Sequence, residues 1–250
     1  MLNSHNPRAI IIGGSRGIGK AVTKMLIESG SHVVFTFNTD KKAAEQLIRE
    51  AKSVSGQVAI SLQLDVRKLE TIGIKISEAV EKLGGLDYLV YSPGGVVIES
   101  VEHVSQKSWS SMMNTHVFGA SEAMKFSSPH LVKSKIGSAV LISSISSLSP
   151  RPSQLAYSSA KAAMNQMARS YAEALASQGV RVNTVLPGLI STDAIKGVDA
   201  DLVQKIIEDT PMKRLGVPTE IAESVIFLLS NRASFITGHS LVVSGGREMQ

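Results

Sequence analysis

Two side chains suited to acid–base chemistry lie four positions apart, Tyr157 and Lys161 in the run Tyr-Ser-Ser-Ala-Lys. On a helix, positions i and i+4 share one face, about one turn apart. An ammonium group close to a phenol favours the phenolate and lowers a phenol pKa from its ordinary value of about 10. The spacing therefore predicts a tyrosine that can act as an acid or a base at neutral pH.

A hydroxyl group can reach the same site. Ser144 stands thirteen positions before Tyr157, just after a predicted strand at Ala139–Ile142. The end of a parallel strand and the helix that follows it can face one crevice. A Tyr-x-x-x-Lys pattern alone is weak, because many helices carry surface tyrosines and lysines. Its interpretation therefore depends on the rest of the chain.

A glycine-rich turn near the N-terminus is the second motif. The run Gly13-Gly14-Ser15-Arg16-Gly17-Ile18-Gly19 follows the apolar residues Ile10–Ile12. Because glycine has no Cβ, backbone N–H groups and the N-terminus of the next helix can closely approach a pyrophosphate. A tight turn between a strand and a helix needs glycine in any case. Its position on the first predicted strand of an α/β chain nevertheless favours a dinucleotide site.

The residues after the second predicted strand bear on which dinucleotide binds. An NAD site places an acidic residue there, which accepts a hydrogen bond from the ribose 2′-hydroxyl. This chain has the neutral Asn38 at the strand end, and Arg16, Lys41 and Lys42 are available for a 2′-phosphate. Asp40 is counter-evidence, unless it caps the following helix. We expect NADP(H) as the cofactor.

These motifs lie on a regular alternation of β-rich and helical segments. Seven strands are predicted at Ala9–Ile12, His32–Phe37, Val58–Leu64, Leu86–Tyr91, Ala139–Ile142, Val180–Leu186 and Leu241–Val243. Helices are predicted at 17–29, 40–54, 67–83, 105–127, 154–178 and 218–230. Near-continuous apolar strands are typical of a parallel sheet covered on both faces. The sequence therefore predicts a doubly wound α/β sheet with helices on both faces, in a single domain over residues 1–250. The irregular stretch 188–217, with a short helix near Asp201–Glu208, is expected to form a substrate wall.

Composition excludes several other classes of protein. The chain has no cysteine, which excludes disulfides and thiol nucleophiles. Its net charge of +5 comes from interleaved basic and acidic residues, and aromatics make up only 4%, which argues against nucleic-acid binding. No apolar run approaches the ~18 residues of a membrane helix, and Met1–Pro7 does not resemble a signal peptide. The histidines show no metal-ligand spacing, so no metal site is predicted. A cytoplasmic enzyme or binding domain remains.

Together, the glycine turn, Ser144 and the Tyr157/Lys161 pair resemble the classical short-chain dehydrogenase/reductase family. The similarity covers essentially the whole chain, extends to Arg181–Gly188, and is greatest to the 3-oxoacyl-[acyl carrier protein] reductase branch. It implies a Rossmann-type fold and hydride transfer between NAD(P)H and a small-molecule carbonyl, such as a 3-oxoacyl thioester carried on acyl carrier protein or coenzyme A. It also implies a homotetramer, for which the alanine-rich helix at 154–178 offers a surface for close helix packing.

The resemblance also implies roles for particular residues. Tyr157 is expected to be the general acid, Lys161 to tune its pKa and bind the ribose, and Ser144 to orient the carbonyl. Asp65, after the third predicted strand, could meet the adenine amino group or cap a helix. The cofactor-binding residues expected by position are Gly13, Ser15, Arg16, Gly17, Ile18, Gly19, Asn38, Asp65, Val66, Gly94, Tyr157, Lys161, Pro187, Gly188 and Thr192.

The chain departs from the family pattern at two places. Where the family usually shows Asn-Asn-Ala-Gly after the fourth strand, this chain has Tyr91-Ser92-Pro93-Gly94. The active-site asparagine of the family falls on His116, unless a local irregularity moves Asn114 into its place. An imidazole can exchange a proton as well as hold a water molecule, so His116 is expected to take part in proton supply. A histidine that only packs and hydrogen-bonds is the alternative.

Other functions remain open at this point. An enoyl reductase or a specialised biosynthetic ketoreductase would share the fold, and the altered turn at Tyr91-Ser92-Pro93-Gly94 permits either. A non-catalytic dinucleotide-binding protein belongs to a different class. Such a protein needs the glycine turn but not Ser144, Tyr157 and Lys161 together, so their presence favours an enzyme.

Overall fold

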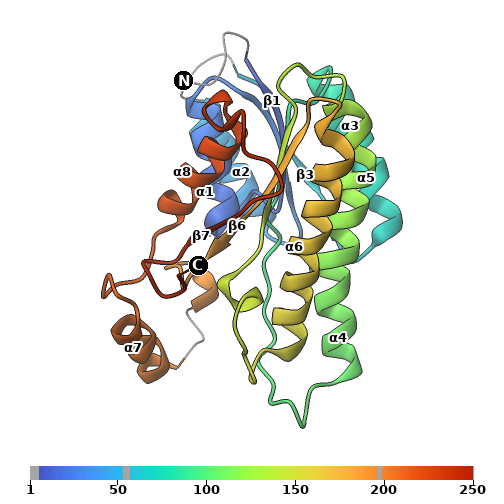
Figure 1. Ribbon diagram of the computed structural model, residues 1–250. Coiled ribbons are helices and arrows are strands. Elements are labelled where there is room, and N and C mark those ends of the chain that lie inside the picture. Colours follow the sequence, from blue (N-terminus) through green and yellow to red (C-terminus); the bar gives the residue numbers. More distant parts are fainter. Residues whose placement is uncertain (1–5, 53–56, 196–198, 250) are drawn as a thin grey trace.

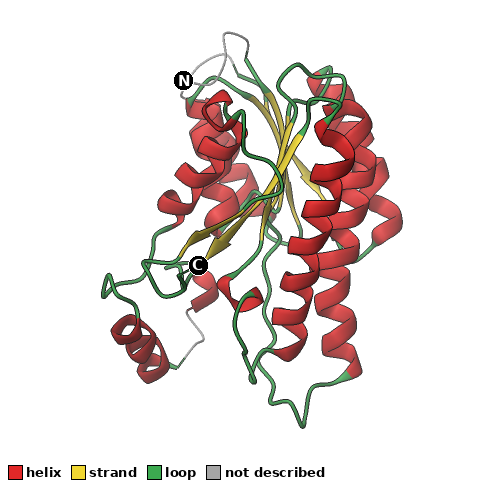
Figure 2. Cartoon of the chain, viewed as in Figure 1, coloured by secondary structure: helices red, strands yellow, loops and turns green. Residues whose placement is uncertain are grey.

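Seven parallel strands form the centre of the molecule (Figures 1 and 2). The computed structural model describes residues 6–52, 57–195 and 199–249. The strands are β1 (Arg8–Ile12), β2 (His32–Phe37), β3 (Ala59–Gln63), β4 (Tyr88–Tyr91), β5 (Ser138–Ile142), β6 (Arg181–Pro187) and β7 (Ser240–Val243). Their order in the sheet is β3-β2-β1-β4-β5-β6-β7, and every neighbouring pair is parallel. The predicted doubly wound, seven-stranded sheet is confirmed.

Helices cover both faces of this sheet (Figure 1). One face carries α1 (Gly17–Glu28), α2 (Lys41–Lys52) and α8 (Pro218–Leu229). The other face carries α3 (Leu69–Leu83), α5 (Gly119–Leu131) and α6 (Leu155–Ala176), and α4 (Gln106–Met113) packs against α6. No helix of the described segments is long and apolar enough to cross a membrane.

Strand β1 is buried on both faces of the sheet, which explains its unbroken apolar run from Ala9 to Ile12. Ile10 and Ile12 join the buried cluster under α3, α5 and α6, whereas Ala9 and Ile11 join the cluster under α1 and α8. Successive side chains of a strand point to opposite faces, so a sheet covered on both sides needs apolar residues at every position. The same alternation fixes the register of β1 between β2 and β4.

The helix predicted at 105–127 is divided in the structure. It consists of α4, the π-helical segment η1 (Asn114–Phe118) and α5, which continues to Leu131. A π-helical turn inserts one residue into the helical ladder, and such turns are frequent at functional sites. Periodicity of apolar residues does not reveal this insertion, because the flanking turns keep the helical period.

The polypeptide reverses its direction of winding between β1 and β4. β1 is followed outward by β2 and then β3 on one side, and β4 leads to β5, β6 and β7 on the other. Open α/β sheets bind ligands outside the carboxyl ends of their strands at such a switch point. The excursion after β6 contains the short helix η3 (Asp193–Ile195) and α7 (Ala200–Asp209), and a bridge between Ile190 and Gly216 closes its base.

Candidate active site

A cavity of about 780 Å³ opens at the carboxyl ends of the strands. It extends from the glycine turn after β1 to the start of α6 and the excursion after β6. Sixteen of the residues predicted for the site line it: Gly13, Ser15, Arg16, Gly17, Ile18, Asn38, Asp65, Val66, Gly94, His116, Ser144, Tyr157, Lys161, Pro187, Gly188 and Thr192. Gly19 is not among the described lining residues.

The packing of the glycine turn explains why Gly19 does not line the cavity. Gly13 and Gly17 have φ angles of +79° and +52°, in the left-handed region that glycine adopts without strain. A Cβ on Gly19 would lie 2.1 Å from the Gly13 carbonyl oxygen. Gly19 therefore permits α1 to pack closely on the turn. A Cβ on Gly13 would meet the backbone of Ser92 at 2.8 Å, so the first glycine is needed for close approach to the turn after β4.

Charged side chains near the end of β2 differ in whether they line the cavity. Asp40 accepts a hydrogen bond from the Ala43 N–H at 3.0 Å, so its carboxylate caps the start of α2, as the alternative interpretation of this residue required. Arg16 and Asn38 line the cavity, but Lys41 and Lys42 are not among its described lining residues. Of the three basic residues considered for a 2′-phosphate, Arg16 is therefore the one that lines the cavity.

Asp65 has a partner that the sequence did not suggest. Its carboxylate accepts hydrogen bonds from Arg67 Nε at 2.9 Å and from Arg67 Nη2 at 2.8 Å. The guanidinium holds the pKa of Asp65 below its usual range. Lys68, not Asp65, occupies the N-cap position of α3, so the helix-cap alternative for Asp65 is not observed. Arg67 itself lines the cavity and was missed, because a cation two residues beyond a strand is usually a surface residue.

Ser144, Tyr157 and Lys161 meet where β5 ends and α6 begins. Lys161 is 3% exposed, and its Nζ donates a hydrogen bond to the Ile142 carbonyl at 2.7 Å. The same Nζ lies 5.6 Å from the centre of the Tyr157 ring. Burial lowers the pKa of Lys161 to about 7, and the hydrogen bond to Ile142 works against this change because it favours the ammonium form.

The pKa of Tyr157 is shifted in the direction opposite to the one expected from the sequence. Burial raises it, and a hydrogen bond with the Ser144 side chain opposes the rise. Burial dominates because a phenolate loses its hydration in the cavity wall. Lys161 provides less attraction than the spacing suggested, since burial reduces its own charge at neutral pH. The structure confirms the proximity of these three side chains.

His116 reaches the cavity from the π-helical segment η1. It is 1% exposed, and its Nε2 lies 2.9 Å from the Gly95 carbonyl oxygen. A carbonyl can only accept, so Nε2 carries the hydrogen and Nδ1 is left with a lone pair. Nδ1 is buried and has no hydrogen-bond partner among the described residues. Burial, assisted by the charge of Lys161, lowers the pKa of His116 well below 6.5, so the ring is neutral at pH 7.

Asn114 does not replace His116 at the site. The local irregularity that could have moved Asn114 into place exists, but it brings His116 to the cavity, and Asn114 is not among the described lining residues. The His116 ring packs edge-on against the Tyr157 ring, with 5.4 Å between their centres.

Hydrogen bonds join the two chain segments that contain the departures from the family pattern. The Tyr91 hydroxyl, at the end of β4, donates a hydrogen bond to the Thr115 carbonyl of η1 at 2.5 Å. A Cβ on Gly119 would lie 2.5 Å from the Tyr91 hydroxyl, so a glycine at the start of α5 makes room for the phenol. The turn after β4 and η1 are thus tied twice, by Tyr91 and by His116.

Apolar side chains from three segments line part of the cavity. The apolar side chains that line the cavity in the α4 and 188–217 regions and after β4 are Val96, Met112, Leu189, Ile190 and Ile195. Sequence reasoning assigned none of them firmly to the site, because apolar residues in these positions have the same pattern as core residues. Among the described residues there is no group of three or more His, Asp or Glu side chains placed to hold a metal ion.

Comparisons with known proteins agree with this site. The chain matches the family model described as enoyl-(acyl carrier protein) reductase over residues 13–248. 3-Oxoacyl-[acyl-carrier-protein] reductase of Staphylococcus epidermidis is 31% identical over 244 residues, which cover 98% of this chain and all of that protein. Glucose 1-dehydrogenase 2 of Bacillus subtilis is 33% identical, over 95% of this chain and 93% of that protein. The crystal structure of acetoin dehydrogenase from Salmonella typhimurium has a TM-score of 0.88 and 28% identity, with 97% of both chains covered.

The fold, the site and these similarities define an oxidoreductase that uses a nicotinamide dinucleotide. The chain belongs to the short-chain dehydrogenase/reductase family.

The buried amine of Lys161 leads to a prediction about stability and pH. Its pKa is about 7 in the folded chain, against an ordinary value of 10.5. Between these values the unfolded chain binds more protons than the folded chain, so the free energy of unfolding rises with pH in this window. Lys161→Met removes the effect. We expect the free energy of unfolding of the wild type, minus that of Lys161→Met, to increase from about pH 7 to about pH 10 in urea titrations. A difference that does not change with pH would contradict this.

Proposed function

We propose that this protein reduces a 3-oxoacyl thioester, or a similar ketone, with NADPH. The observation that carries the proposal is the meeting of Ser144, Tyr157 and Lys161 in the cavity that begins at the glycine turn. In the reaction, a hydride adds to the carbonyl carbon and a proton adds to the carbonyl oxygen, which gives a secondary alcohol. A protein that only bound a dinucleotide would have no use for these three side chains.

We assign a role to each of the three from its position. The nicotinamide ring supplies the hydride when the cofactor is bound. The Ser144 hydroxyl, beside Tyr157, donates a hydrogen bond to the carbonyl oxygen and holds it against the phenol. Tyr157 protonates that oxygen, and Lys161 stabilises the phenolate that remains. Lys161 uses one hydrogen for the Ile142 carbonyl, so two are left for ribose hydroxyls.

Several observations support NADP(H) as the cofactor. The glycine turn forms a cradle where added Cβ atoms would clash, as a pyrophosphate site requires. Asn38 is neutral at the end of β2, and Asp40 is occupied with the cap of α2. Arg16 lines the cavity beside the turn and is exposed, so its guanidinium is free to bind a 2′-phosphate with two hydrogen bonds.

The apolar wall favours a substrate with a hydrocarbon chain next to its carbonyl. Val96, Met112 and Ile195 would cover such a chain, and the thioester end could carry acyl carrier protein or coenzyme A. The Staphylococcus relative is a reductase of this kind of substrate by name. The description of the matched family model keeps an enoyl thioester as the competing substrate. An enoyl reductase adds hydride to a carbon–carbon double bond, whereas the Ser144–Tyr157 pair is suited to a carbonyl oxygen.

A panel of substrates tests this proposal. A 3-oxoacyl thioester, an enoyl thioester and acetoin are each supplied with NADPH and with NADH, and oxidation of the cofactor is followed by absorbance. We expect the highest kcat/KM for the 3-oxoacyl thioester with NADPH. Reduction of the enoyl thioester alone would assign the protein to the competing reaction. Cofactor binding without reduction of any ketone would indicate a non-catalytic dinucleotide-binding protein.

The choice between NADPH and NADH is predicted to depend on Arg16. Loss of a charge-assisted contact to phosphate should cost about 2–3 kcal/mol, so Arg16→Ala should raise the KM for NADPH roughly 30-fold or more. The KM for NADH should change little, because NADH has no 2′-phosphate. Lys42→Ala is the matched control, since Lys42 is exposed and is not among the described lining residues. An equal loss for both cofactors would refute the assignment.

We further propose that His116 takes part in proton supply. After Tyr157 has given up its proton, the site must receive another from solvent. The Nδ1 lone pair of His116 is buried beside the Tyr157 ring and can accept a hydrogen bond from a water molecule there. The carbonyl of Gly95 fixes the tautomer that leaves this lone pair available. An imidazole that only packs is the competing interpretation.

Substitution of His116 separates these two interpretations. If it relays protons, His116→Ala should lower kcat about tenfold or more, with the KM for the cofactor nearly unchanged. His116→Asn should restore part of the rate, because an amide can also hold a water molecule. Protonation of Nδ1 removes the acceptor, so the acid side of the wild-type pH–rate profile should contain an ionisation that His116→Asn lacks. A wild-type kcat and an unaltered pH profile would show that His116 only packs.

We also propose a homotetramer, assembled through α5 and α6. Four alanines of α6 pack inside the monomer, but Ala162, Ala174 and Ala176 remain exposed. Phe118 and Phe126, on η1 and neighbouring α5, are 46% and 38% exposed, which is high for phenylalanine in the absence of a partner. Light scattering should give a mass of about four times the chain mass of 26.6 kDa. A particle with the mass of one chain would contradict the assembly.

A further inference from the structure

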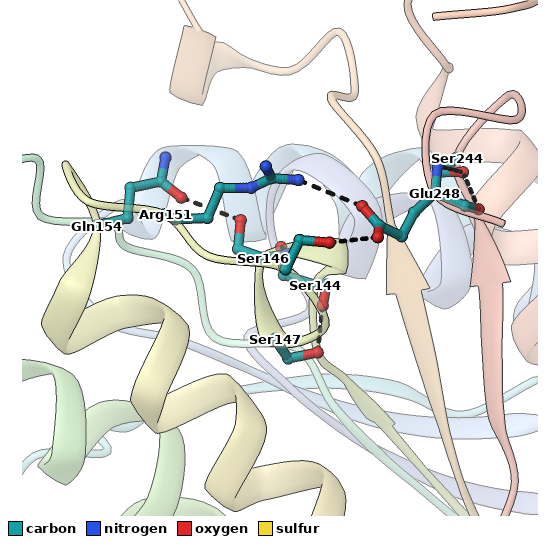
Figure 3. Close-up of polar contacts among 8 residues, drawn as sticks. Ser144, Ser146, Ser147, Arg151, Gln154, Ser244 and Glu248 are labelled. Carbon is teal, nitrogen blue, oxygen red and sulfur yellow. Dashed lines mark hydrogen bonds and ion pairs between the residues drawn. The ribbon is translucent and has the colours of Figure 1, made fainter. Parts of the chain in front are cut away.

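The C-terminal tail, residues Ser244–Glu248, lies beside the loop that carries Ser144 (Figure 3). The tail is closed on itself: the Glu248 N–H donates to the Ser244 hydroxyl at 3.2 Å, and this hydroxyl donates to the Glu248 carbonyl at 3.2 Å. Gly245 and Gly246 have φ angles of +65° and +85°, which this tight turn requires. The turn fixes the direction in which the Glu248 side chain points.

The carboxylate of Glu248 binds the loop between β5 and α6. The Ser149 hydroxyl donates a hydrogen bond to its Oε1. Arg151 Nη2 lies 3.4 Å from its Oε2 (Figure 3). The Arg151 and Glu248 side chains are 29% and 20% exposed, so water only partly screens the pair. Glu248 and Ser149 are 99 positions apart in the sequence.

The first part of the same loop, residues 144–147, forms hydrogen bonds within itself and with Gln154 and Asn165 at α6. The Ser144 hydroxyl accepts from the Ser146 N–H at 3.1 Å, and the Ser144 carbonyl accepts from the Ser147 hydroxyl at 2.6 Å. The Ser146 hydroxyl donates to Gln154 Oε1 at 3.0 Å, and Asn165 donates to the Ser147 hydroxyl at 2.8 Å. Ser144 therefore belongs to a short network of serines, and Glu248 binds the segment that follows this network, at Ser149 and Arg151. The end of that segment is held separately, by the Glu99 N–H, which donates to the Ser153 carbonyl at 3.0 Å.

The tail also contacts the end of the excursion after β6. The Met212 N–H, at the end of the excursion 188–217, donates to the Gly245 carbonyl at 3.1 Å. A Cβ on Gly246 would lie 2.9 Å from Pro211 Cγ, so tail and excursion are in close contact there. One short segment thus touches both the loop that follows β5 and the end of the excursion after β6.

We propose that Glu248 is a positioning residue for the reaction of the Ser144–Tyr157–Lys161 site. Its carboxylate holds the loop 144–154 against the tail, and the tail holds that loop at a fixed place relative to residues 210–212. Glu248 is not among the described residues that line the cavity, so it acts through Ser149 and Arg151. The inference rests on the proposed carbonyl reduction, because the orientation of Ser144 matters only if Ser144 binds the carbonyl oxygen.

Variants of Glu248 test the proposal with two readouts on the full-length protein. Glu248→Ala should lower kcat for the carbonyl substrate about tenfold, since a hydrogen bond to a charged group is lost, and Glu248→Gln should lower it less because the amide still accepts from Ser149. The dissociation constant of NADPH should stay within about twofold, because the glycine turn is untouched. Amide hydrogen exchange, measured without substrate, should become faster in 145–153 and stay unchanged in the second half of α6. Glu223→Gln, which changes an exposed carboxylate on α8, is the control.

Ser149→Ala removes the same contact from the side of the loop and leaves the tail intact, so it serves if Glu248→Ala does not fold. We expect its effect on kcat to be smaller than, and not multiplicative with, that of Glu248→Ala. An unchanged kcat in both variants, with or without faster exchange, overturns the proposal. If the wild-type protein reduces no ketone, the proposed function is wrong, whatever the variants show. In that case the hydrogen-exchange data alone decide whether Glu248 holds the loop.

Discussion

The hydrogen bond from the buried Lys161 amine to the Ile142 carbonyl fixes the geometry on which the site depends. An amine in an apolar interior must find an acceptor, and the carbonyl at the end of β5 provides one. The Ser143 hydroxyl adds a second tie, to the Lys161 carbonyl at 3.2 Å. These two hydrogen bonds fix the position of α6 relative to the end of β5. Tyr157, one turn earlier on the helix, is thereby placed beside Ser144, which follows the strand.

Two hydrogen bonds from side chain to backbone join η1 and the turn after β4, which both line the cavity. Tyr91 donates to a carbonyl of η1, and His116 of η1 donates to a carbonyl of the turn after β4. A π-helical segment leaves carbonyls poorly paired within the helix, and the Tyr91 hydroxyl satisfies one of them. The two departures from the family pattern are therefore one structural change, because each residue supports the backbone segment that carries the other.

The sequence predicted the sheet well because its signals are local and repeated. Strand bounds such as His32–Phe37 follow from the apolar run, and the carboxyl ends of parallel strands must share one edge. The helix over 105–127 was predicted without its π-helical segment, since one inserted residue leaves no mark in the apolar period. The Asp65–Arg67 pair and the contact of Glu248 with Ser149 depend on side-chain directions and on residues far apart in sequence. The pKa of Tyr157 was predicted in the wrong direction because spacing reveals a neighbouring charge but not the depth of burial.

Tyr157→Phe tests most directly whether Tyr157 delivers the proton in the proposed carbonyl reduction. The substitution keeps the ring that packs against His116 and removes only the hydroxyl. Single-turnover oxidation of NADPH by a saturating 3-oxoacyl thioester is the measurement, with NADPH binding followed by fluorescence. We expect the rate to fall at least about 100-fold and the binding of NADPH to stay unchanged. A variant that reduces the ketone at the wild-type rate would contradict the account.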